Sequence, residues 1–229
     1  MEKEADVMMN VGLKKDWKIC LPPYKMLYSL LFIVILSLIR GISDVYEIGG
    51  AVDSYMALLA IIICSDVYVM EYRGKRWEVF SLFPLGSKVK AVYRRLGSQI
   101  LYLSLLSYVG YWFFFWQKPL NQFEISPFLL YGMFLAAAAT SIAFWGTLSM
   151  TLSNLCRNMW AGVGISMILW MGINSKRGAE VLGDFNVFAF SFCDAQEFTK
   201  WNWMWGKGTA LLIAAVMLAA VPIILKKSG

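Results

Sequence analysis

The chain of 229 residues contains no histidine. Histidine is the commonest general base and metal ligand in proteins, so a Ser-His-Asp triad and a zinc site of the HExxH type are excluded. A phosphate-binding loop of the form GxxxxGK[ST] is also absent, because the GKGT sequence at residues 206–209 lacks the upstream glycine. We therefore expect no cofactor and no nucleotide hydrolysis by that route in this chain.

Charged residues are scarce as well, at 16% of the chain against 59% hydrophobic residues, and the mean hydropathy is +0.59. Soluble domains are about 25% charged and about 45–50% apolar. The four cysteines are scattered without CxxC spacing, which argues against a zinc site and against a disulfide framework. The composition predicts a polytopic membrane protein. The first 25 residues lack the pattern of a cleaved signal peptide, so we expect the first span to be retained.

Six apolar segments have about the length that a helix needs to cross a bilayer, roughly 20 residues. We expect an all-α membrane protein whose single transmembrane domain covers residues 1–229. The fifth segment is only 15 residues long, so it must borrow flanking residues or thin the bilayer locally. The predicted spans are residues 24–42, 49–70, 96–116, 127–152, 159–173 and 208–225.

The distribution of Lys and Arg predicts the orientation of these spans. Fifteen of the 21 basic residues fall in the N-terminal segment, the connections after the second and fourth spans, and the C-terminus. Because cytoplasmic connections are enriched in Lys and Arg, both termini should be cytoplasmic in a multi-pass protein of the cell membrane. The same asymmetry accounts for a pI near 9.1, so no nucleic-acid partner is needed to explain it.

Two segments outside the spans have unusual patterns. Residues 1–23 form a cytoplasmic leader. Within it, helical spacing puts an apolar face opposite the lysines, as in an amphipathic helix at the membrane interface. That face consists of Leu13, Trp17, Cys20 and Leu21. An ordinary solvated basic leader is the alternative. The extracytoplasmic loop, residues 174–207, contains eight Phe and Trp residues, which prefer the headgroup level. We expect short interfacial or re-entrant helices there, before the sixth span.

The predicted second and fourth spans contain polar or small residues. Asp53 and Asp66 are 13 residues apart, or roughly 20 Å along a helix. Each either pairs with a neighbouring span or reaches an interface; alternatively, Asp53 joins Asp44 and Glu47 in an outer acidic vestibule at the pathway or gate. Residues 135–154 are rich in Ala, Ser, Thr and Gly, which permits close helix packing inside the bundle or between subunits.

A dense charge cluster, MEYRGKRWEVFSLFPLGSKVKAVYRR at residues 70–95, separates the second and third predicted spans. Its aromatic residues Trp77, Phe80 and Phe83 recur at helical spacing, which predicts a short amphipathic helix over about residues 75–83. Pro84 should end this helix, and a turn at residues 86–87 should lead into the third span. A cytoplasmic helix held between two spans is suited to docking on a partner protein.

This segment resembles the coupling helix of type-2 ATP-binding cassette exporter permeases. In that family an acidic residue ends the second span, and a glycine, a second acidic residue, an apolar run, a proline, a serine and a basic residue follow. The matching positions here are Glu71, Gly74, Glu78, residues 79–83, Pro84, Ser87, Lys88 and Arg95. The spacing from Gly74 to Glu78 is one residue longer than usual, and aromatic residues replace the expected leucines. The resemblance extends over nearly the whole chain, including an elbow helix before the first span.

The resemblance implies a permease subunit that forms the substrate pathway of an exporter. It implies three partners: a separate ATPase subunit that binds ATP-Mg, a second copy or a homologous permease, and the lipid bilayer. The implied cargo is a hydrophobic peptide, a drug or a lipid. The implied ATPase-coupling residues are Glu71, Arg73, Arg76, Trp77, Glu78, Phe80, Phe83, Pro84 and Ser87.

Besides a non-transporting scaffold, two other classes of function remain open at this point. A six-span substrate-capture subunit of an energy-coupling-factor importer would bind a vitamin tightly as an isolated chain, although compact loops are typical of that class. A membrane-embedded enzyme that needs no histidine, using carboxylates or a Ser-Lys pair, would turn over substrate without any ATPase.

Overall fold

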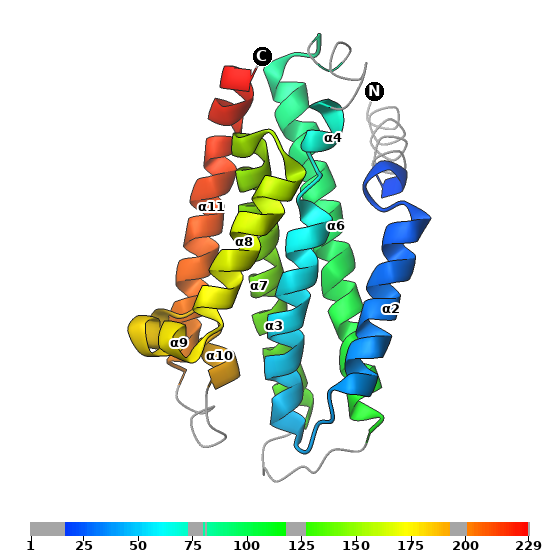
Figure 1. Ribbon diagram of the computed structural model, residues 1–229, viewed down its shortest axis with the longest axis vertical. Helices are drawn as coiled ribbons and strands as arrows, with labels where there is room; N and C mark the ends of the chain where they lie inside the picture. Colours follow the sequence, from blue (N-terminus) through cyan, green and yellow to red (C-terminus); the bar gives the residue numbers. More distant parts are fainter. Residues whose placement is uncertain (1–16, 73–79, 81, 118–126, 193–200, 229) are drawn as a thin grey trace, which may run out of the picture.

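The structure, a computed structural model, describes residues 17–72, 80, 82–117, 127–192 and 201–228. These residues form helices joined by turns, with no β-strand among them, which confirms the predicted all-α class. Six long helices run alternately up and down in one bundle (Figure 1). They are α2 (Pro23–Ile39), α3 (Val45–Cys64), α6 (Leu85–Phe115), α7 (Pro127–Cys156), α8 (Met159–Ile173) and α11 (Trp203–Ser228).

Three helical stretches of the described chain are long and apolar enough to cross a membrane: Glu47–Glu71, Phe128–Cys156 and Trp203–Lys226. The helices α2 and α8 are apolar but shorter, at 17 and 15 residues. Large apolar side chains on the outer face of α11, such as Leu212 and Ile223, are exposed, an arrangement that suits lipid better than water. The structure therefore confirms a membrane-spanning helical character, and the full set of six spans stays a prediction.

The third long helix begins earlier than predicted. The helix α6 starts at Leu85 rather than at residue 96 and continues for 31 residues. Pro84 is its N-cap residue, and the Pro84 carbonyl accepts hydrogen bonds from the backbone N–H groups of Ser87, at 3.0 Å, and Lys88, at 3.2 Å. The predicted turn at residues 86–87 is thus wrong. Proline lacks an N–H but fits the start of a helix, where that N–H would have no partner inside the helix.

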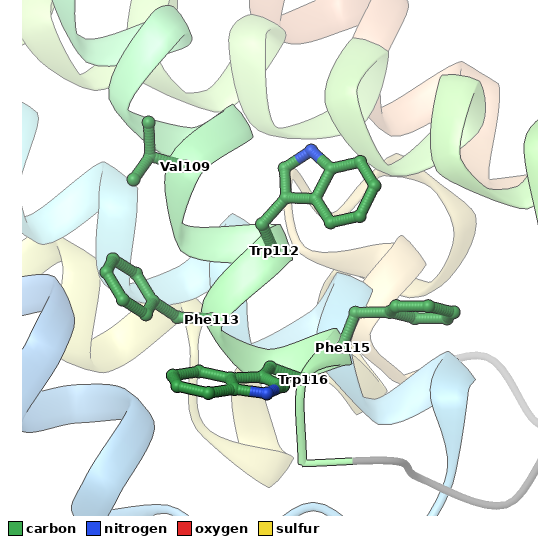
Figure 2. Close-up of a pocket in the computed structure, with 5 residues that line it drawn as sticks. All are labelled: Val109, Trp112, Phe113, Phe115 and Trp116. Atoms are coloured by element: carbon green, nitrogen blue, oxygen red, sulfur yellow. The ribbon is translucent and has the colours of Figure 1, made fainter.

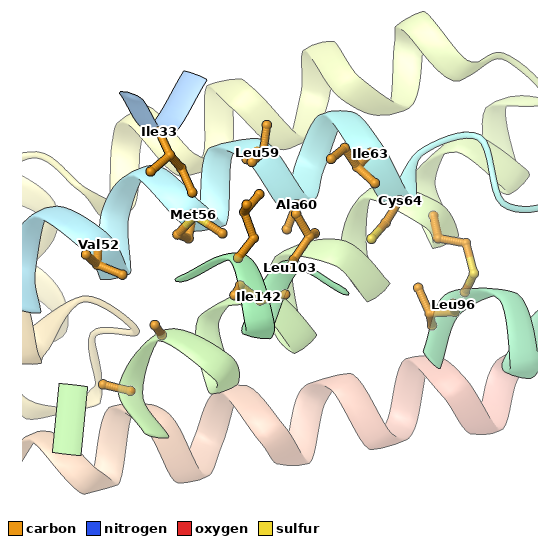
Figure 3. Close-up of a cluster of buried hydrophobic side chains, with 14 of the residues drawn as sticks. Ile33, Val52, Met56, Leu59, Ala60, Ile63, Cys64, Leu96, Leu103 and Ile142 are labelled. Carbon is orange, nitrogen blue, oxygen red and sulfur yellow. The ribbon is translucent and has the colours of Figure 1, made fainter. Parts of the chain in front are cut away.

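The centre of the bundle is the packing of α3 against α7. A Cβ atom added at Gly146 of α7 would lie 2.9 Å from the Cys64 sulfur of α3, and Ala137 and Ala138 are also buried. Small residues on α7 therefore let the two backbones approach closely, as predicted for residues 135–154, and the packing occurs within one chain. Side chains of α3 such as Val52, Met56 and Leu59 face residues of the neighbouring helices (Figure 3).

Shorter helices occupy the two ends of the bundle (Figure 1). The helix α4 (Val69–Tyr72) lies at the end that also contains the start of α6 and the C-terminal end of α11. The opposite end contains α9 (Lys176–Leu182), the 3-10 turn η1 (Gly183–Phe185) and α10 (Ala189–Phe192). The predicted aromatic loop therefore does contain short helices.

Two phenylalanines of this loop are buried inside the bundle. The ring of Phe188 stacks on Trp145 with ring centroids 5.8 Å apart, and the ring of Phe190 lies 5.0 Å from that of Trp203. Phe185, by contrast, is exposed.

Only the last part of the leader lies within the described residues. Residues 17–20 are helical, with Cys20 and Leu21 buried and Lys18 exposed. The predicted amphipathic helix lies mostly outside the described residues and stays a prediction. The Gln99 side-chain amide of α6 donates a hydrogen bond to the Cys20 carbonyl at 3.2 Å. The described end of the leader is thereby attached to α6.

Candidate functional site

The predicted coupling residues fall into two groups. Arg73, Arg76, Trp77 and Glu78 lie outside the described residues. The other five lie around α4 and the start of α6, at one end of the bundle (Figure 1), which we call the coupling end. These five are Glu71, Phe80, Phe83, Pro84 and Ser87.

Glu71 pairs with Arg95. The guanidinium Nη1 of Arg95 on α6 donates a hydrogen bond to Oε1 of Glu71 on α4, and both side chains are buried. Since a buried charge is costly without a partner, this pair fixes the end of α4 to the flank of α6. The two ends of the segment 71–95 are therefore joined.

Phe80 and Phe83 face different surroundings. Phe80 is only 8% exposed, its ring lies edge-on to Tyr68 at 6.0 Å, and the Lys88 ammonium lies 5.8 Å from its centroid. Phe83 is 52% exposed, and the neighbouring Leu82 is 84% exposed. Phe80 therefore packs against the bundle, whereas Leu82 and Phe83 present apolar surface away from it.

A second ion pair lies near the coupling end. The Lys25 ammonium at the start of α2 donates a hydrogen bond at 2.5 Å to Oδ2 of Asp66, and both residues are buried. Asp66 lies in the turn between α3 and α4, whereas Glu71 lies in α4 itself. The short stretch that contains both carboxylates is thus bound to α2 on one side and to α6 on the other.

The opposite end of the bundle contains a polar cluster that we call the outer polar cluster: Asp53, Ser141, Ser191 and Lys207. Asp53 of α3 is fully buried. The Lys207 ammonium of α11 donates to its Oδ1 and Oδ2 at 2.8 and 2.6 Å, and to the Ser141 hydroxyl of α7 at 2.8 Å. The Ser191 hydroxyl of α10 lies 3.5 Å from Oδ2. Asp53 and Asp66 thus each pair with a lysine on another helix. This agrees with the interpretation that each acid pairs with a neighbouring span.

Asp44 and Glu47, the other residues of the predicted vestibule, lie at the start of α3. Asp44 is its buried N-cap residue, and the Glu47 carboxylate accepts a hydrogen bond from the Ser43 N–H at 3.1 Å. The vestibule itself stays a prediction.

Sequence reasoning missed Lys207 as the partner of Asp53. The prediction counted it as a loop residue just before the sixth span, but α11 begins at Trp203 and places it inside the helix. A basic residue within one turn of an apolar span, with an acid buried in another span, was the available signal.

An apolar groove of about 460 Å³ lies on the outer surface of α6 (Figure 2). Its lining consists of Val109, Trp112, Phe113, Phe115 and Trp116. No charged group lines it, and its side chains are apolar except for the indole N–H groups of Trp112 and Trp116, so it suits mainly apolar contacts. The described part of the chain also contains no group of Cys, Asp and Glu side chains arranged to hold a metal ion.

No protein-family model matches this chain, and neither a curated protein nor a solved structure is significantly similar to it. The fold and the hydropathy define the class, a helical membrane protein. Buried ion pairs join its helices at both ends of the bundle.

Proposed function

We propose that the chain is the membrane-spanning permease subunit of an ATP-driven exporter and that a separate ATPase subunit docks on its segment 71–95. The observation that carries the proposal is the buried Glu71–Arg95 pair. It joins both ends of a charged segment to the helices α4 and α6, at the end of the bundle where the positive-inside rule puts the cytoplasm.

Firm attachment is what a coupling segment needs, because a push from an ATPase must reach the spans. Glu71 and Asp66 lie in or beside α4, which follows α3 after a short turn, and their partners lie on α6 and α2. The helix α3 in turn packs on α6, α7 and α8. A movement of this segment would therefore be transmitted to α2, α3 and α6 together.

The exposed residues of the segment supply the docking surface. Leu82 and Phe83 project apolar side chains at the coupling end, next to the basic first turns of α6. Aromatic residues that fill a partner's pocket contribute most of the affinity at protein interfaces. We assign Phe83 to the groove of the ATPase and Phe80, which packs on Tyr68, to transmission of the movement.

The remaining parts of the proposal follow from the family resemblance. The chain would have six spans with an elbow helix before the first, both termini in the cytoplasm, and a second permease copy beside it. ATP-Mg would bind to the ATPase subunit. The cargo would be a hydrophobic peptide, a drug or a lipid.

Co-purification tests this proposal. The tagged chain is extracted from membranes of its own host in a mild detergent, and the associated proteins are identified by mass spectrometry. We expect a P-loop ATPase in near-stoichiometric amount, and much less of it with Phe83→Ala. Ile39→Ala is the control, since Ile39 is also an exposed apolar residue and lies at the far end of α2. Absence of any ATPase, together with tight vitamin binding by the chain alone, would overturn the proposal.

A further inference from the structure

The Asp53–Lys207 pair links two helices that have little other contact. The helix α11 packs mainly on α7, with further contacts to η1, α6 and α10. Lys207 extends past Ser141 of α7 to reach Asp53 of α3, and both charged side chains are buried. This ion pair therefore joins the first turns of α11 to the central helix of the bundle.

Stability alone is a weak reason for a buried ion pair, because well-packed apolar side chains of similar volume often stabilise a protein as much or more. Charged residues buried among apolar helices of a membrane protein are commonly functional. The pair also offers two discrete states, since separation of α3 and α11 breaks all its short hydrogen bonds at once.

The helix α10 rests directly on α3 beside this pair. A Cβ atom at Gly49 would lie 2.5 Å from the Phe134 ring of α7 and 2.8 Å from the Phe190 ring of α10, and one at Gly50 would lie 3.4 Å from the Ser191 Cα atom. Because Gly49 and Gly50 have no side chains, they leave a flat surface on α3 against which α10 packs. We call this surface the α10 seat. The Ser191 hydroxyl lies 3.4 Å from the Gly50 carbonyl and 3.5 Å from both Asp53 Oδ2 and the Ser54 hydroxyl, so its own hydrogen bonds are long and weak.

We infer that α10 is an outer gate, seated on Gly49 and Gly50, which the Asp53–Lys207 pair keeps closed. When the pair separates, α11 moves away from α3, and α10, which packs on both, leaves its seat. Water then reaches the polar groups of α3 from the outer end. The inference does not rest on the ATPase partner, so either proposal can fail while the other stands.

Labelling of a cysteine at position 191 tests the gate in the full chain. The parent variant contains Ser191→Cys together with Cys156→Ser and Cys193→Ser, which leaves only the buried thiols of Cys20 and Cys64 besides the probe. In nanodiscs, the rate of reaction with a membrane-impermeant maleimide reports water access to the α10 seat. The thermal unfolding midpoint of each variant is measured in parallel.

We expect slow labelling of the parent and labelling about tenfold faster or more in Asp53→Asn, because the change shifts the population toward the open state. Ser141→Ala, which removes one contact of Lys207 and keeps the pair, should give a smaller increase. If Asp53→Asn does not fold, Ser141→Ala decides the question. Asp66→Asn breaks the buried Lys25–Asp66 pair and should leave labelling at position 191 unchanged. Ser107→Ala should also leave it unchanged, because the Ser107 hydroxyl donates to the Ser104 carbonyl within α6.

Three results would overturn the proposal that α10 is a gate. One is slow labelling in Asp53→Asn and Ser141→Ala while both remain folded. Another is an equal increase in Asp66→Asn, which would indicate general loosening of the bundle. The third is a parent that already labels as fast as the exposed Cys156 does in the unaltered chain.

Discussion

Arg95 on α6 donates a hydrogen bond to Glu71 on α4, and both residues are buried at the coupling end of the bundle. The residues are 24 positions apart, and the charged segment lies between them. Their pairing fixes where that segment leaves the bundle and where it returns. A partner bound to the segment therefore acts on two helices at once.

Loss of the Glu71 charge should destabilise the protein strongly. In Glu71→Gln the Arg95 guanidinium stays buried without its counter-charge, which costs about 3–5 kcal/mol. Chemical denaturation in detergent should show this loss, and the exchange variant Glu71→Arg with Arg95→Glu should recover part of it. Stability of Glu71→Gln equal to that of the parent would contradict the pairing.

The two phenylalanines of the coupling end should respond differently to truncation. Phe80→Ala removes a buried ring and should cost about 3–5 kcal/mol of stability, with Phe80→Leu much milder. Phe83→Ala removes an exposed ring and should change stability by only about 0.5 kcal/mol, yet weaken ATPase docking by about 2 kcal/mol. In the assembled complex Phe80→Ala should also uncouple ATP hydrolysis from transport. Denaturation and affinity measurements separate these effects; similar losses of stability in both variants would contradict the two assignments.

Close packing of α3 and α7 can be tested at Gly146. Its Cβ position lies 2.9 Å from the Cys64 sulfur, so Gly146→Ala should destabilise by about 1–3 kcal/mol. Adding Cys64→Ala removes the sulfur and should recover most of this loss. Gly132→Ala is the control in the same helix, because apart from the adjacent backbone no atom lies within 4 Å of its Cβ position, and it should be neutral or stabilising. An unfolding midpoint for Gly146→Ala at or above that of Gly132→Ala would refute the close approach.

The predicted orientation can be tested with a native thiol. Cys156 is exposed at the turn between α7 and α8, where the positive-inside rule places the cytoplasm. In a Cys193→Ser variant of intact cells, an impermeant maleimide should not label Cys156 until the membrane is permeabilised. Labelling of Cys156 from outside would show that the predicted orientation is wrong. The coupling end would then face away from the cytoplasm, where an ATPase could not reach it.

The long helices were predictable because a long apolar segment in a bilayer must satisfy its own backbone hydrogen bonds, and a helix does so. The bounds of α8 agree with the predicted fifth span at residues 159–173. The start of α6 was missed because its basic residues were assigned to a loop, whereas the helix continues through them from Pro84. A run of charged residues indicates that a segment lies near water, but it does not indicate whether the backbone of that segment is helical.

The partners of the buried acids were not predicted, for a different reason. Asp53 and Lys207 are separated by 154 residues, and Lys25 and Asp66 by 41, so only the packing of the bundle brings them together. Helical spacing predicted that Phe80 and Phe83 share a face of one helix. In the structure Phe80 is buried and Phe83 is exposed, because the chain turns at Leu82 and Phe83 before α6 begins at Leu85.

The most direct test of the exporter account is a photo-crosslinking residue placed at position 83 in host membranes, with position 39 as the control site. The account predicts a covalent product between position 83 and a P-loop ATPase, and no such product from position 39. Crosslinks from position 83 to lipid alone, or only to proteins without an ATP-binding site, would contradict it.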